Sequence, residues 1–226
     1  MEYDHPMIAR ASIALTALLL AASGVTAGQD ASTFKRIYTA GEKRSYSIDI
    51  DQKDKAGTTT SVDLDLTVAK VQDTGVDLAV HFSNLQSVEV AGKVSEDRTV
   101  PMGPHNLPLN ATFQDRTTEA ALPFFFLAGA TSDKAAKAGD ETPIQWKCNL
   151  MGFDGSVKVL SISNGRIKSL VKAKVQIQGI EVGDIAFTSD ESLPGCALID
   201  SVGALTFSAR FGGSSLVEEF KITQRK

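Results

Sequence analysis

The sequence has three histidines, and only His81 and His105 lie beyond the N-terminal region. Histidine is the most frequent general base, and the strand register predicted below places Asp65 opposite His81. Such a pair could orient a base toward a nucleophile. However, the G-x-S-x-G nucleophile elbow is absent, because Leu216 occupies the second glycine position in GGSSL. We interpret Asp65 and His81 as a cross-strand surface pair, and we expect no catalytic residues.

Cys148 and Cys196 are the only cysteines. In an oxidising compartment an even number of cysteines favours a disulfide, which would stabilise the fold by roughly 4 kcal/mol in the chain-entropy model. One alternative is a pair of buried thiols. Another is a Cys196 nucleophile with His105 as its base, which excludes the disulfide. The sequence has no C-x-x-C motif or Cys/His cluster, so redox catalysis and structural zinc have little support.

Several aspartates alternate with apolar residues, namely Asp49, Asp51, Asp63, Asp65 and Asp77. They could bind calcium or serve as glycosidase carboxylates, but alternation is more typical of the solvated face of a sheet, and calcium sites usually collect ligands on loops. No glycine-rich loop opens a helix after a strand, so nucleotide binding has no support. The net charge of −4 argues against nucleic acid as a partner. We expect no metal and no cofactor.

The N-terminus is typical of a secretory signal. Residues 13–22 form a short apolar run, and Val-Thr-Ala at 25–27 resembles a cleavage site. Glu2 and Asp4 precede the run where positive charge is expected, which suggests that Met7 is the true start. We therefore predict a signal peptide over residues 1–27 and a single domain over 28–226, exported to the periplasm or beyond the cell. The apolar run is too short for a spanning helix of about 20 residues.

Alternation of apolar and polar residues predicts half-buried antiparallel strands in RSYSIDIDQ, SVDLDLTV and VDLAVHF. Asp-Thr-Gly at 73–75 predicts a hairpin between the second and third of these. Because Val71 departs from the even-numbered apolar pattern, we predict a bulge near Ala69 and Lys70. The resulting register pairs Val68 with Leu78, Leu66 with Val80, Leu64 with Phe82, and Lys70 with Asp77.

The C-terminal half repeats this pattern. PIQWKCNL predicts a strand with Ile144, Trp146, Cys148 and Leu150 facing inward. Asn-Gly at 164–165 predicts a type I′ hairpin turn, and Gly-Gly at 212–213 predicts a closing hairpin. The fold class that follows is mainly β, with a curved, half-barrel-like antiparallel sheet and a short central helical insertion.

The insertion covers about residues 91–141. Pro101, Pro104 and Pro108 make residues 91–118 loop-like, and the apolar run ALPFFFLAGA follows at 121–130. Pro123 suits the first turn of a short helix, and Ser132 and Gly139 suit the cap and the end of another. Ten residues cannot span a bilayer as a helix. The run therefore fills the core, covers a hydrophobic cavity, or forms an exposed patch that meets a partner or membrane.

The signal sequence, the chain length, the antiparallel strands and the short central helices together resemble the LolA-type lipoprotein carriers of bacterial envelopes. The resemblance implies a curved sheet around an apolar cavity that holds acyl chains, closed by short helices. It leads us to expect a non-catalytic envelope protein that binds a lipid or another apolar ligand through Leu122, Phe124, Phe125, Phe126 and Leu127. The alternative is a structural or interaction module of the envelope with a solid core, no small-molecule ligand and an envelope protein as partner.

Overall fold

A computed structural model describes most of the chain after its N-terminal region. The described residues are 32–33, 36–53, 59–73, 75–87, 90–103, 109, 135–148, 151–193, 195–208 and 216–226. All of them belong to the compact unit Ala31–Lys226. The predicted signal peptide lies outside the described residues.

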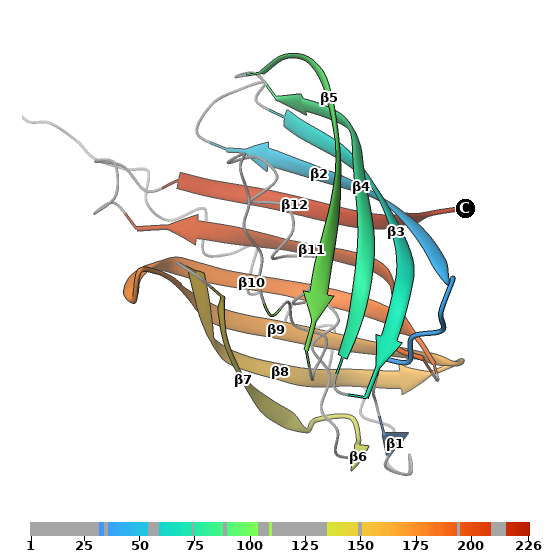
Figure 1. The fold of residues 1–226 in the computed structure, drawn as a ribbon. Coiled ribbons are helices and arrows are strands. Elements are labelled where there is room, and N and C mark those ends of the chain that lie inside the picture. The colour runs from blue at the N-terminus through green and yellow to red at the C-terminus, as the bar shows by residue number, and fades with distance from the viewer. Residues whose placement is uncertain are drawn as a thin grey trace, which may run out of the picture. The chain divides into compact units, whose positions relative to one another are not determined.

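Most of the described residues form one large antiparallel sheet (Figure 1). Its ten strands lie in the order β5-β4-β3-β2-β12-β11-β10-β9-β8-β7. The sheet thus joins two meanders, β2 to β5 and β7 to β12, through the pairing of β2 with β12. The bounds of the strands are β2 Lys43–Gln52, β3 Thr59–Gln72, β4 Gly75–Ser87, β5 Val90–Met102, β7 Glu141–Cys148, β8 Met151–Ser163, β9 Arg166–Ile177, β10 Ile180–Ser192, β11 Ala197–Phe207 and β12 Leu216–Arg225.

The sheet is not closed, because β5 and β7 are its two edges. A separate two-stranded sheet pairs β1 (Ser32–Thr33) with β6 (Ala135–Ala136). Within the described ranges there is no helix. The prediction of a mainly β, antiparallel protein is therefore confirmed, and the predicted helical insertion is not supported.

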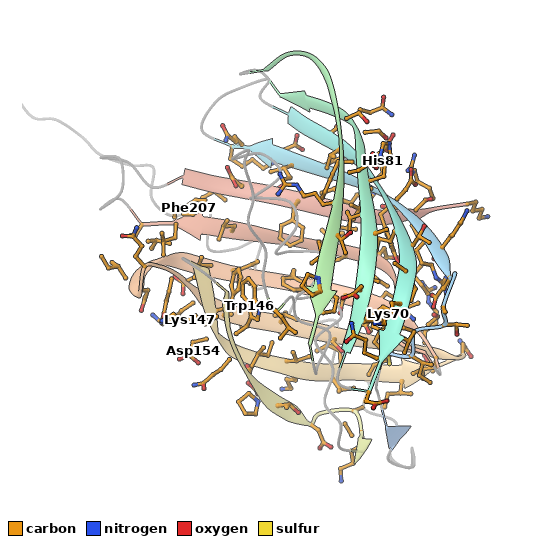
Figure 2. The ribbon with its side chains drawn as sticks, in the orientation of Figure 1. Lys70, His81, Trp146, Lys147, Asp154 and Phe207 are labelled. Atoms are coloured by element: carbon orange, nitrogen blue, oxygen red, sulfur yellow. The ribbon has the colours of Figure 1, made fainter. Side chains whose placement is uncertain are left out.

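One face of the sheet is buried and the other meets solvent, because side chains alternate along each strand. Trp146 and Lys147 show the alternation on β7, where they point to opposite sides of the strand (Figure 2). Most buried apolar side chains of both meanders, from Leu64 on β3 to Phe153 on β8, belong to one large hydrophobic cluster. A second, smaller cluster contains Ala136, Val159, Ile167 and Cys196. We call this buried face the inner face and the solvated one the outer face.

The predicted register of the β3–β4 hairpin is confirmed in full. Leu64 pairs with Phe82, Leu66 with Val80, and Val68 with Leu78, as the alternation requires. The register shifts between Val68 and Lys70, where the bulge was predicted, and Lys70 then pairs with Asp77. The extra residue places Val71 opposite the buried Val76, which explains why Val71 breaks the even-numbered pattern, although Val71 itself is 47% exposed.

The predicted turn at residues 164–165 is also confirmed. Asn164 and Gly165 have φ angles of 51° and 69° and connect β8 to β9, as a type I′ turn requires. The strands of the closing hairpin, β11 and β12, pair as expected from Phe207 and Leu216 onward. Its Gly-Gly turn at 212–213 lies outside the described residues.

Two predictions for the insertion are wrong. Residues 90–102 are not a loop but strand β5, which accepts Pro101 because an edge strand can leave a backbone N–H position unpaired. The helix predicted from Ser132 to Gly139 is contradicted by strand β6 at Ala135–Ala136 and by the turn that follows it. The run ALPFFFLAGA and its predicted helix lie outside the described residues.

Gly203 on β11 permits an aromatic contact across the inner face. It is the register partner of both Phe187 on β10 and Phe220 on β12. These two rings meet edge to face, with centroids 5.6 Å apart. A Cβ atom on Gly203 would lie 2.2 Å from the Cβ of Phe187 and 2.4 Å from the carbonyl oxygen of Ala186. The position therefore excludes any side chain while the two rings keep their places.

Replacing Gly203 with alanine is expected to lower the free energy of unfolding by about 1–3 kcal/mol, because the new methyl group must displace Phe187 or bend the strand. Urea unfolding followed by circular dichroism measures the change. Val202→Ala is the matched control, because Val202 is 52% exposed on the outer face, and its effect should stay within about 0.5 kcal/mol. Equal losses in the two variants would contradict the packing argument.

Candidate ligand-binding site on the inner face

The predicted Asp65–His81 surface pair lies on the outer face, but the two side chains have different partners. They are register partners, as predicted. However, the Nδ1 atom of His81 lies 2.7 Å from a carboxylate oxygen of Asp97 on β5, and Asp65 accepts a hydrogen bond of 2.7 Å from Arg225. His81 is visible among the solvated side chains of β4 (Figure 2). His105 lies outside the described residues.

The aspartate row is part of a network of polar contacts. Arg225 lies within 3.3 Å of Asp63 and 2.7 Å of Asp65. Asp49 accepts a hydrogen bond from Ser61, and Asp77 accepts one from Gln72. Among the described residues, no group of three or more His, Cys, Asp and Glu side chains is placed to hold a metal ion. These contacts agree with the interpretation of a solvated sheet face.

The strand register separates the two cysteines. Cys148 pairs with Met151, which pairs with Ile177 at one end of β9. Cys196 follows β10 beyond Ser192, whose partner is Arg166 at the other end of β9. Those ends are roughly 35 Å apart at about 3.3 Å per residue, whereas a disulfide joins Cα atoms no more than about 7 Å apart. The structure therefore does not support the predicted disulfide.

The residues predicted to bind an apolar ligand, from Leu122 to Leu127, lie outside the described residues. The inner face instead presents a feature that the sequence analysis missed, namely a polar patch within the apolar surface. Ser189 on β10 is the register partner of Ser169 on β9 and of Ser201 on β11. All three serines are buried, and Glu191, two residues beyond Ser189, is only 2% exposed. We call Ser189, Glu191 and Ser201 the Glu191 cluster.

The hydrogen bonding of the Glu191 cluster is incomplete. The hydroxyl group of Ser189 donates to Oε1 of Glu191 over 3.2 Å. The other carboxyl oxygen, Oε2, is buried and has no hydrogen-bond partner in the described structure. The same is true of the hydroxyl group of Ser201 on the neighbouring strand. A buried polar atom without a partner typically costs about 1–3 kcal/mol, so two of them on adjacent strands require an explanation.

The segment that precedes β2 adds a positive charge near this cluster. Its backbone joins the β10–β11 turn, where the N–H of Ile37 donates to the carbonyl oxygen of Gly195 over 3.1 Å. The guanidinium group of Arg36 donates to Glu42 over 2.7 Å and stacks on the ring of Tyr38, 4.4 Å from its centroid. Arg36 is thus paired with Glu42 and does not form an ion pair with Glu191.

Burial dominates the electrostatics of the cluster. It raises the pKa of Glu191 to about 8, although the hydrogen bond from Ser189 and the charge of Arg36 lower it. Burial also raises the pKa of the Tyr38 phenol and of the Cys196 thiol to about 12. At pH 7 Glu191 is therefore mostly a neutral carboxylic acid, which can donate one hydrogen bond and accept others. Cys196 is a neutral thiol, which is a poor nucleophile.

A second acid on the inner face, Glu218 on β12, has a different environment. It accepts a hydrogen bond of 3.0 Å from Gln52 on β2. Burial raises its pKa, and this hydrogen bond opposes the shift. Glu218 is thus satisfied by a neighbouring strand, and the contrast identifies Glu191 as the acid with an unused oxygen.

The sequence does contain a signal for Glu191. In IAFTSDES the inward positions continue from Ile185 and Phe187 through Ser189 to Glu191. An acid at an inward position departs from the alternation, and such departures are expected at functional sites.

The raised pKa of Glu191 predicts that stability falls as the pH rises. Between about pH 4.5 and pH 8 the unfolded chain loses the proton of Glu191 and the folded protein retains it, so the free energy of unfolding decreases over this range. The Glu191→Gln variant should lose this dependence and exceed the native protein in stability at pH 9 by an amount on the order of a few kcal/mol.

Urea unfolding at pH 5, 7 and 9 measures this effect. Glu218→Gln is the matched control, with a smaller change because Gln52 already stabilises the charged form of Glu218. Parallel pH profiles of the native protein and Glu191→Gln would show that Glu191 titrates normally.

No described helix has the length and apolar character needed to cross a membrane. Comparison of the chain with protein-family models and with curated proteins finds no match. The inner face with its Glu191 cluster is therefore the candidate functional site.

Proposed function

We propose that the protein is an exported, non-catalytic protein of the bacterial envelope that binds a lipid or another apolar ligand on the inner face of its sheet. One observation carries the proposal: a broad apolar face contains a small group of buried polar atoms that lack partners within the described structure. Ligand sites commonly have this character, with mostly apolar walls and a few polar groups that orient the ligand.

The open edges of the sheet are compatible with such a role. Because β5 and β7 do not pair with each other, the inner face is not enclosed by backbone hydrogen bonds. In the proposal, the inner face is covered by Leu122, Phe124, Phe125, Phe126 and Leu127, which contact the ligand. The proposal of no catalytic activity is supported by the location of His81 on the outer face and by the neutral state of Cys196.

The alternative is an envelope interaction module with a solid core, and one observation favours it. Most apolar side chains of the inner face are already buried within one large cluster, as they would be in a core that has no ligand. Pairing of a partner strand with a sheet edge has less support. Pro101 on β5 and Pro143 on β7 each remove a backbone donor from an edge, and proline is a common protection against edge pairing.

Native mass spectrometry of the protein purified gently from a bacterial periplasm distinguishes the two functions. We expect a lipid bound in stoichiometric amount, because a large apolar face favours an apolar ligand. The Phe125→Asp and Phe126→Asp variants should lose that lipid while they remain folded. Val202→Asp places the same charge on the outer face and should retain the lipid. A clean mass of the protein alone, unchanged after incubation with membrane lipids, would refute the carrier function and favour the interaction module.

A further inference from the structure

We propose that the Glu191 cluster is the head-group subsite of the ligand and that it selects a long aliphatic chain ending in an uncharged oxygen group, such as a hydroxyl or an ester carbonyl. This inference rests on the proposed function, because it assigns one end of the ligand to a defined place on the inner face.

The two unpartnered atoms come from adjacent strands and face the same side of the sheet. Ser201 on β11 is the register partner of Ser189, and Glu191 follows Ser189 by two residues on β10. A β-bulge between Asp190 and Glu191 makes Leu198 the register partner of Glu191. Ser189 connects the two groups, because its hydroxyl group donates to Glu191 over 3.2 Å and Ser201 lies directly opposite it. A small polar group beside Ser189 would be the shared partner of Glu191 and Ser201. Neither atom has another partner within the described ranges.

The apolar surface next to the cluster suits an aliphatic chain. Phe187 lies two residues before Ser189 on β10, and Gly203 lies two residues after Ser201 on β11. Phe187 and Gly203 are register partners. The edge-to-face pair of Phe187 and Phe220 continues this surface onto β12. A ligand whose polar end meets Glu191 would thus place its chain along these aromatic side chains.

The charges around the subsite favour an uncharged head group. The neutral acid of Glu191 and the hydroxyl group of Ser201 can both donate to an oxygen atom. Arg36, whose charge acts on Glu191, is already paired with Glu42 over 2.7 Å. A carboxylate or phosphate would therefore bring an uncompensated charge into a buried environment, which is costly.

An ordered water molecule is the competing explanation, because buried waters often satisfy such groups. The two explanations make different demands on Ser201. If a water bridges the cluster as part of the fold, removal of the Ser201 hydroxyl group lowers stability and leaves ligand preference unchanged. If the cluster is a subsite, the same change lowers the preference for a polar head group and leaves the stability of the free protein unchanged or raised.

The experiment compares hexadecan-1-ol with hexadecane, which differ only in the hydroxyl group. Both are radiolabelled, delivered from cyclodextrin, and measured by co-elution with the protein in gel filtration. We expect the native protein to prefer the alcohol, and we expect Ser201→Ala and Glu191→Met each to reduce that preference about tenfold, as for the loss of one buried hydrogen bond. Glu218→Gln, a change to the acid that Gln52 already satisfies, should keep the native preference. Urea unfolding of the ligand-free variants is measured in parallel.

Equal binding of both compounds, with Ser201→Ala and Glu191→Met behaving like the native protein, would overturn the head-group subsite and leave the proposed function in place. Binding of neither compound by the native protein would overturn both. A loss of stability in Ser201→Ala without a change of preference would assign the cluster to a structural water.

Discussion

Each strand of the sheet must bury the same face, because the inner face supplies the large hydrophobic cluster that both meanders share. Backbone hydrogen bonds connect each strand only to its neighbours, so they cannot by themselves bring β3 and β8 into one core. Burial of apolar side chains, worth about 25 cal/mol per Å², supplies that long-range connection. Two local features of the strands also follow from the burial of one face. The bulge after Val68 brings Val71 opposite the buried Val76, and Gly203 allows two aromatic rings to meet on the inner face.

Glu191 conflicts with this constraint. Its carboxyl group lies on the buried face, where an aliphatic side chain would satisfy the strand pattern at lower cost. The structure accommodates the group by keeping it neutral. Arg36 is close enough to influence Glu191, but its guanidinium group donates to Glu42 and to the carbonyl oxygen of Gly195 instead. A buried neutral acid with one unpartnered oxygen lowers the stability of the fold. The same oxygen is available to bind a polar group of a ligand.

The local parts of the fold could be predicted from the sequence, and the non-local parts could not. Alternation and turn residues determine the β3–β4 register and the turn at Asn164, because both depend on neighbouring residues in the chain. Strand β5 was missed because Pro101 is read as a loop residue unless the strand is known to be an edge. The separation of Cys148 from Cys196 depends on the registers of three strand pairs, which no local sequence pattern determines.

The Glu191 cluster shows which part of the candidate site could be predicted from the sequence and which part could not. Alternation places Glu191 and Ser201 on the inner face, so their burial could have been read from the sequence. Glu218 has the same alternation and is also buried, yet Gln52 satisfies its carboxyl group across the β2–β12 pairing. That pairing joins the first long strand of the sheet to the last, and only the assembled sheet reveals it. The difference between a satisfied acid and one with an unused oxygen therefore arises from tertiary structure, and it is this difference that marks Glu191 as the candidate for ligand recognition.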